Sequence, residues 1–339
     1  MNRSVFAPGR VNLIGDHTDY AGGLALPIAI QLGTTVTFDF DDTLDTILFR
    51  SDSQEQAAEI KIDIDKSQVR QVEPSWARFV AATIALSDGI VGGTGAITSS
   101  LPIGSGLSSS ASFAIALTMA LGLDTDDLVG FAQEVEHLAT GVPCGKLDQM
   151  AIVNGKQHCG VQIDFRDLSY TYVEIPDEID IFIVESGQTR QLEHSNYGTR
   201  QESALKAISM LGDLRETSLD KVADLGNIEL INICTHIISE NERVIRFGEA
   251  LSVKDFNSAG RLLTESHWSL SNFYRVSTPI LDNLVERANL IKGVLGARLT
   301  GAGFGGSVVV LGEAGLDLQE SLSEKVIKVL PSKGAALVN

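Results

Sequence analysis

Apolar and polar positions alternate along the first part of the chain in the way that is typical of strands. Strands are predicted at residues 3–7 and 32–40, the second from its alternation and β-branched side chains. Residues 60–64 alternate within an acidic stretch, which predicts an edge strand. Further short apolar runs predict strands at residues 95–99, 160–165, 171–175, 179–185 and 307–311.

Longer segments with helical periodicity lie between and after these strands. They predict helices at residues 75–87, 113–121, 125–140, 147–153, 196–211, 227–250, 254–267 and 277–293. Because strands and helices mix without a strict βαβ rhythm, the pattern favours an α+β fold over a doubly wound sheet. No internal repeat is evident.

Composition narrows the class of protein. The 339 residues are 44% hydrophobic and 21% charged, which is enough for two globular domains. A formal charge of −18 disfavours nucleic acid and anionic membrane surfaces as partners. Three cysteines without a CxxC pair fit a reducing compartment, and no apolar run approaches a membrane span, so we expect a cytoplasmic protein. A monomer is compatible with the sequence.

A segment near the N-terminus gathers side chains suited to chemistry. Residues 7–20 are expected to form a glycine-punctuated loop between short apolar runs, and they contain Arg10, Asp16, His17 and Asp19. Ionised carboxylates accept hydrogen bonds from hydroxyl groups, so this spacing suits a polyhydroxylated ligand. A solvated turn with incidental charges is the alternative reading.

A glycine-serine loop, residues 104–112, runs directly into an apolar helix. A flexible linker would not be followed at once by such a helix, so we expect backbone N–H groups at a helix N-terminus that bind phosphate. A serine hydroxyl here is a candidate ligand for Mg²⁺. The loop is neither a Walker A motif nor a Rossmann turn. Its candidate phosphate-binding residues are Gly104, Ser105, Gly106, Leu107, Ser108, Ser109, Ser110 and Ala111.

Two weaker patterns complete the candidates. Asp148 follows a Gly-containing break at the start of a predicted helix, where it serves either as a general base or as an N-cap. The glycine-rich segment 301–306 either cradles a ligand or turns tightly before a buried strand.

Together these segments resemble the GHMP kinase superfamily and, within it, the galactokinase family. The resemblance rests on four motifs in family order, at residues 8–20, 106–112, 142–149 and 299–306. It implies a two-domain α+β fold, with domains at residues 1–165 and 166–339 and the active site in the cleft between them. It also implies transfer of the γ-phosphate of ATP, with Mg²⁺, to the anomeric hydroxyl of galactose.

Site roles follow from the same resemblance, position by position. Arg10 and Asp148 would form the catalytic pair, Ser110 and Glu136 would serve Mg²⁺, and Trp76 would lie near the adenine. The implied sugar contacts are Asp16, His17, Asp19, Gly145 and Tyr197. Trp76 as a core side chain and Tyr197 as a surface tyrosine remain open alternatives.

The chemistry of the implied pair can be anticipated. Opposite charges about 4 Å apart attract by about 4 kcal/mol at an effective dielectric constant of about 20. We therefore expect Asp148 to orient the sugar hydroxyl and to take its proton late in a loose phosphoryl-transfer transition state.

Some positions depart from the family pattern. Asp16 stands where galactokinases usually carry glutamate, Ala302 replaces a usual glycine, and residues 190–194 differ from the usual sequence. The exact sugar therefore stays open: galacturonate, N-acetylgalactosamine and arabinose are alternatives, with Arg190 or Lys146 as a cation for galacturonate. A non-catalytic galactose sensor is disfavoured, because Ser110, Ser112 and Asp148 are all present.

Overall fold

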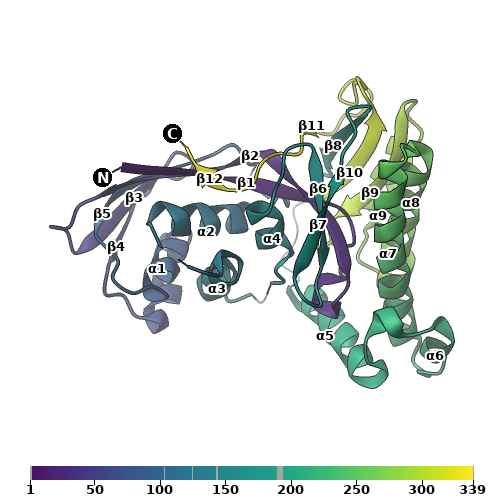
Figure 1. Ribbon diagram of the computed structural model, residues 1–339, viewed down its shortest axis with the longest axis horizontal. Coiled ribbons are helices and arrows are strands. Elements are labelled where there is room, and N and C mark those ends of the chain that lie inside the picture. The colour runs from purple at the N-terminus through teal and green to yellow at the C-terminus, as the bar shows by residue number, and fades with distance from the viewer. Residues whose placement is uncertain (1, 103, 124, 143, 189–193, 339) are drawn as a thin grey trace.

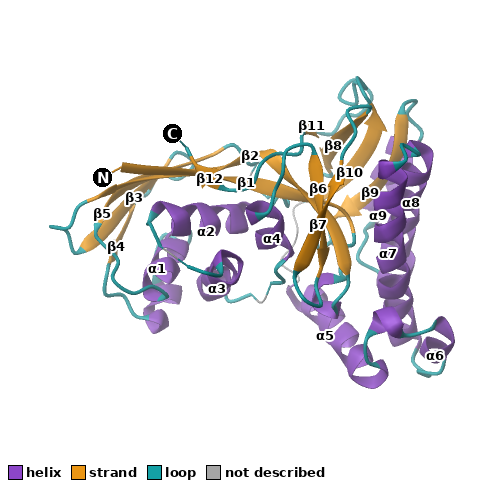
Figure 2. Cartoon of the chain, in the orientation of Figure 1, coloured by secondary structure: helices purple, strands orange, loops and turns teal. Residues whose placement is uncertain are grey.

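The computed structural model describes residues 2–102, 104–123, 125–142, 144–188 and 194–338. The chain forms two lobes (Figure 1), and both are built from sheets and helices (Figure 2). This mixed arrangement confirms the predicted α+β class.

The first sheet is organised around a long hairpin of two N-terminal strands. β1 and β2 pair antiparallel, with Val5 opposite Val36, and the sheet order continues as β12-β1-β2-β5-β3-β4. A second hairpin, formed by β6 and β7, pairs with the first residues of β2, Leu24 and Ala25. The strands are β1 (Asn2–Ile14), β2 (Leu24–Phe40), β3 (Thr46–Ser51), β4 (Ala58–Lys61), β5 (Gly93–Ser99), β6 (Cys159–Asp164), β7 (Ser169–Glu174) and β12 (Ala336–Leu337).

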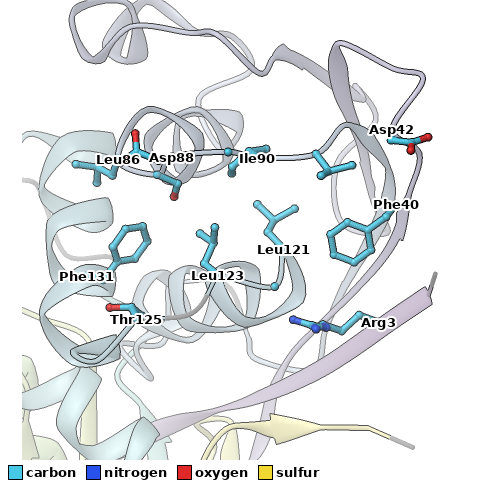
Figure 3. Close-up of a pocket in the computed structure, with 14 residues that line it drawn as sticks. Arg3, Phe40, Asp42, Leu86, Asp88, Ile90, Leu121, Leu123, Thr125 and Phe131 are labelled. Atoms are coloured by element: carbon cyan, nitrogen blue, oxygen red, sulfur yellow. The ribbon is translucent and has the colours of Figure 1, made fainter.

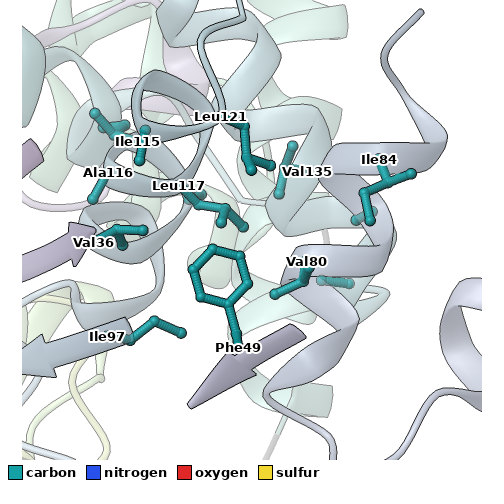
Figure 4. Packing of buried hydrophobic residues seen from close by; sticks show 14 of the residues in the cluster. Val36, Phe49, Val80, Ile84, Ile97, Ile115, Ala116, Leu117, Leu121 and Val135 are labelled. Atoms are coloured by element: carbon teal, nitrogen blue, oxygen red, sulfur yellow. The ribbon is translucent and has the colours of Figure 1, made fainter. Parts of the chain in front are cut away.

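Four helices pack on one face of this sheet (Figure 2): α1 (Ala77–Ala85), α2 (Ser109–Ala120), α3 (Leu128–Thr140) and α4 (Leu147–Val153). In Figure 4, Phe49 of the sheet points among Leu117 of α2, Val80 of α1 and Val135 of α3. Helix α2 is apolar on nearly all sides because the other helices and the sheet surround it.

The second lobe contains a four-stranded sheet with the order β11-β8-β10-β9. Its strands are β8 (Ile179–Glu185), β9 (Val294–Thr300), β10 (Ser307–Glu313) and β11 (Val326–Val329). Its helices are α5 (His194–Leu211), α6 (Leu219–Ala223), α7 (Ile228–Ser252), α8 (Phe256–Ser269) and α9 (Pro279–Asn289). The backbones of α8 and β9 are in close contact at Gly260, because a Cβ atom there would lie 2.0 Å from the carbonyl oxygen of Leu295.

Two sequence-based expectations about the fold need comment. The segment 7–20 is not a loop throughout, because β1 continues to Ile14 and only the residues after it turn. The predicted domain boundary after residue 165 stays an interpretation. β6 and β7 pair across it, and β12 returns to β1 of the first sheet.

A cavity of about 990 Å³ lies at the outer end of the first lobe (Figure 3). Apolar side chains such as Phe40, Leu121 and Phe131 line it, with Arg3 at one edge. None of the predicted site residues belongs to its lining, so this cavity is separate from the candidate chemistry. Within the described ranges, the model contains no helix that is both long and apolar enough to cross a membrane.

Candidate active site

The turn between β1 and β2, residues 15–23, begins at a glycine that no other residue can replace without strain. Gly15 has a φ of 94°, and a Cβ there would lie 2.4 Å from the carbonyl oxygen of Leu24. His17 also adopts a left-handed φ of 64°, which is uncommon for residues other than glycine. This β1–β2 loop is thus held in a fixed and partly strained shape.

Arg10 and Asp148 meet where β1 passes the N-terminus of α4. Arg10 Nε and Nη2 each lie 2.6 Å from Asp148 Oδ1, and the Ser108 hydroxyl donates to Asp148 Oδ2. Arg10 is 8% exposed, so this ion pair is shielded from bulk water more than a surface pair would be. The carboxylate is therefore fixed from both sides.

The glycine-serine loop folds around the same arginine. Gly104 and Gly106 have φ angles of 75° and 76°, and Arg10 Nη1 donates to the Gly106 carbonyl at 2.9 Å. Ser108 precedes the first residue of α2 and has a left-handed φ of 59°. Ser307 of β10 donates to the carbonyl of Ser105 at 2.9 Å, so the second lobe holds this loop as well.

Ser110 and Glu136 meet beside the loop through their side-chain oxygens. The Ser110 hydroxyl donates to Glu136 Oε1 at 2.5 Å, and Gln149 Nε2 donates to Oε2 at 2.8 Å. Burial, together with the nearby Asp148 charge, raises the pKa of Glu136 to about 7. A hydroxyl and a carboxylate of this kind suit Mg²⁺, which typically binds one or two protein oxygens plus substrate phosphates.

Asp19 and Gly145 lie in close approach. A Cβ on Gly145 would sit 1.9 Å from Asp19 Oδ2, so only glycine allows this contact without movement. Burial, with a smaller contribution from Asp148, raises the pKa of Asp19 to about 6. Asp19 and Asp148 are therefore close enough to repel each other electrostatically.

Asp16 is buried and pairs with an arginine that the sequence motifs did not identify. Arg298 of β9, which is completely buried, donates to Asp16 Oδ2, and Asn12 Nδ2 donates to Oδ1 at 2.9 Å. Burial raises the pKa of Asp16, while Arg298 and Asn12 oppose the increase. Because the arginine and the aspartate come from different lobes, this pair joins the β1–β2 loop to the second sheet.

Helix α7 carries a second set of buried anchors for the β1–β2 loop. Glu240 Oε1 accepts from the backbone N–H of Gly15 at 3.0 Å, and Asn241 Oδ1 accepts from that of Leu24 at 2.7 Å. His236 Nε2 lies 3.1 Å from the Asp16 carbonyl oxygen. Although burial alone would raise the pKa of Glu240, Arg243 and His236 bring it down to about 2, so this anchor is an anion.

Trp76, among the remaining predicted residues, makes none of the contacts described above. Trp76 precedes α1, and its buried Nε1 has no hydrogen-bond partner within the described parts of the chain. The Trp76 side chain also packs against the hydrophobic core of the first lobe, so the core alternative for this residue stays open. Tyr197 is in α5, but its side chain lies outside the described residues, as does Arg190.

The structure thus brings Arg10, Asp148 and the glycine-serine loop into direct contact. It places Ser110 against Glu136 and Asp19 against Gly145. Sequence reasoning missed the anchors supplied by the second lobe: Arg298, His236, Glu240, Asn241 and Ser307. One sequence signal could have found them: they are charged or polar residues at positions that helical or strand periodicity would bury.

Ala302, the departure in the third glycine-rich motif, is accommodated without strain. Unlike Gly301 and Gly303, with φ angles of 81° and 77°, Ala302 is not among the residues with positive φ. A methyl group is therefore compatible with its backbone conformation.

Family models match three parts of the chain. The galactokinase galactose-binding signature matches residues 2–39, the GHMP kinases N terminal domain matches residues 77–156, and the GHMP kinases C terminal model matches residues 248–333. The galactokinase of Pyrococcus furiosus is 37% identical, with 91% of this chain and 88% of that protein covered. The galactokinase of Mycobacterium tuberculosis is 38% identical, with 92% and 89% covered.

Solved structures agree with the family models. Lactococcus lactis galactokinase complexed with galactose superposes with a TM-score of 0.89 at 29% identity, covering 99% of this chain and 95% of that one. Methanococcus jannaschii mevalonate kinase shares the fold, with a TM-score of 0.70 at 19% identity and 98% of each chain covered. By its sequence and its fold, the chain belongs to the galactokinase family of the GHMP kinases.

Proposed function

We propose that this chain transfers the γ-phosphoryl group of ATP to the anomeric hydroxyl of galactose, giving galactose 1-phosphate and ADP. The observation that carries the proposal is the Arg10–Asp148 pair, which contacts the glycine-serine loop and lies close enough to Asp19 of the β1–β2 loop to act on its charge. Membership of the galactokinase family and the likeness to a galactokinase complexed with galactose support the choice of sugar.

Asp148 is the residue that orients the reacting hydroxyl. Its Oδ1 accepts two N–H groups of Arg10, which hold the carboxylate in place and offset its charge. It therefore accepts the sugar proton late, as the bond from the sugar oxygen to phosphorus forms and the bond to the leaving ADP oxygen breaks. Arg10 also stabilises negative charge on the transferred group.

The glycine-serine loop is the proposed site for the phosphates of ATP. Left-handed glycines and the N-terminus of α2 present backbone N–H groups to an anion. Trp76, with its unpaired indole N–H, is the proposed contact on the nucleotide side.

Mg²⁺ fits the oxygen pair of Ser110 and Glu136, and when bound it would neutralise phosphate charge. In the described part of the chain, no group of three His, Cys, Asp or Glu side chains could hold a metal ion. This supports a site that is completed by the nucleotide rather than by the protein alone.

The sugar contacts are proposed at the β1–β2 loop and around it. Asp16, His17, Asp19 and Gly145 supply carboxylate, imidazole and backbone groups for hydroxyls, and Tyr197 of α5 is the fifth candidate. A related sugar is the second candidate substrate, because the shorter Asp16 carboxylate is committed to Arg298 and Asn12.

A coupled assay of ADP release across a dozen monosaccharides with MgATP tests this function. We expect galactose to give the highest kcat/KM, with C6-modified relatives and arabinose below it. ADP release that is independent of every sugar would overturn the kinase proposal. A clear preference for galacturonate would correct only the identity of the sugar.

A further inference from the structure

Tyr274 is a completely buried tyrosine that closes a π-helical turn, Leu270–Tyr274, after α8. π-Helical turns are rare and occur often at functional sites. The next residue, Arg275, has a left-handed φ of 57° and ends the turn. Tyr274 is thus placed by an unusual local backbone, in a part of the second lobe that no catalytic motif includes.

The hydroxyl of Tyr274 connects this turn to the β1–β2 loop. It lies 2.5 Å from the hydroxyl of Tyr20, which in turn lies 2.9 Å from Nδ1 of His17. The imidazole of His17 also stacks on the Tyr274 ring, with ring centroids 4.7 Å apart and planes at 29°. One side chain therefore fixes His17 both through its ring face and through a chain of two hydroxyl contacts.

This contact determines more than the position of the imidazole. Burial lowers the pKa of His17 to about 3, so the ring is neutral at physiological pH. In a neutral imidazole one nitrogen is a donor and the other an acceptor, and the partner of one nitrogen decides the role of the other. The Tyr20 hydroxyl can donate to Nδ1 or accept from it, so the direction of the Tyr274–Tyr20 hydrogen bond is coupled to the role of Nδ1 and hence to that of Nε2.

The backbone of His17 makes such support necessary. A non-glycine residue with a φ of 64° is strained, and such conformations persist only where the surroundings determine them. Tyr274 stacks on His17 and also contacts His236 of α7, with ring centroids 4.8 Å apart and planes at 52°. The aromatic stack thus ties the loop to the core of the second lobe.

We propose that Tyr274 is a positioning residue for sugar binding, acting through Tyr20 and His17 to set the position of the imidazole and the conformation of the β1–β2 loop. This inference rests on the proposed function, because it assigns His17 to the bound sugar. It adds a specificity-determining contact from the second lobe, outside the four sequence motifs.

The test compares Tyr274→Phe, Tyr20→Phe and the double variant Tyr20→Phe/Tyr274→Phe. Each single change removes one hydroxyl and keeps the ring, and we expect kcat/KM for galactose to fall by about 5- to 50-fold through KM. Because the hydroxyls act in series, the double variant should lose no more than the larger single loss. The KM for ATP and kcat should change by less than about 2-fold. Tyr172→Phe, on the exposed strand β7, is the matched control.

Independent losses that multiply in the double variant would overturn the serial arrangement. Equal losses for galactose and ATP, accompanied by a lower melting temperature, would reduce Tyr274 to a structural role. Tyr20 is only half-buried, so its variant keeps the test decisive if Tyr274→Phe folds poorly. Wild-type protein that releases no ADP with any sugar would instead refute the proposed function and leave galactose binding, measured by calorimetry, as the readout.

Discussion

Arg10 binds one oxygen of Asp148 while Ser108 binds the other, although the arginine and the aspartate are 138 positions apart in sequence. Oδ1 already accepts two N–H groups of Arg10, whereas Oδ2 accepts only the Ser108 hydroxyl, so Oδ2 remains able to accept one more hydrogen bond from a substrate hydroxyl. The geometry thus fixes the direction from which a hydroxyl can approach.

Asp148→Asn removes the proton acceptor while it keeps the shape of the side chain. We expect kcat to fall by about 10²- to 10⁴-fold, because the amide cannot take the sugar proton. Galactose affinity, measured by calorimetry without nucleotide, should stay within a few-fold. Near wild-type turnover in this variant would remove Asp148 from the role of base.

Ser108→Gly and Ser108→Ala separate the hydroxyl from the backbone strain. Both variants lose the hydrogen bond to Asp148 Oδ2, and we expect about a 10- to 150-fold lower kcat in each, since a bond to a charged group contributes about 1.5–3 kcal/mol. Alanine must adopt the left-handed φ of 59° without the hydrogen bond that serine makes, whereas glycine adopts this φ without strain.

Thermal denaturation should therefore rank the glycine variant as more stable than the alanine variant. If kcat falls only in the alanine variant, backbone strain rather than the hydroxyl explains the effect.

Local patterns in the sequence predict most helices and strands but not how far strands extend. β1 continues past Pro8 and Gly9 because register shifts in the β1–β2 ladder absorb the missing N–H of proline. The strand β9 was not expected, since Gly296 and Arg298 interrupt its apolar run. The structure explains both residues: Gly296 lets α8 approach, and Arg298 is buried because Asp16 neutralises it.

The candidate site divides in the same way. The residues of the glycine-serine loop are neighbours in sequence, so their composition alone indicates phosphate. Contacts such as Glu240 with Gly15 join residues 225 positions apart, and no local pattern encodes them. The resemblance to a family predicted the roles of Arg10 and Asp148, whereas the residues that anchor the β1–β2 loop became visible only in the three-dimensional structure.

Asp16→Glu tests whether the Asp16 carboxylate, which is hydrogen-bonded to Arg298 and Asn12, determines the sugar preference. An added methylene must fit between Asn12 and the buried Arg298, and overpacking of this kind typically costs about 1–3 kcal/mol. We expect a lower melting temperature and a changed ratio of kcat/KM among galactose, its C6-modified relatives and arabinose. The exposed Asp63→Glu should change neither quantity. Unchanged ratios would indicate that Asp16 only anchors the loop.

Glu136 should make both stability and MgATP binding depend on pH. Its pKa rises to about 7 in the folded protein from an ordinary value of 4.5, so the fold favours the protonated acid. Its contribution to stability is therefore complete below about pH 4.5 and is lost as pH rises through 7. Without ligand, the melting temperature should fall between pH 5.5 and 8, and Glu136→Gln should flatten this slope relative to the exposed Glu134→Gln on the same helix. Some slope should persist, because the pKa of Asp19 is raised to about 6 as well.

Mg²⁺ prefers the ionised carboxylate, so MgATP binding at pH 6.5 should release a fraction of a proton, detectable by calorimetry in buffers of different ionisation enthalpy. Equal proton release by wild type and Glu136→Gln would exclude Glu136 as the ligand.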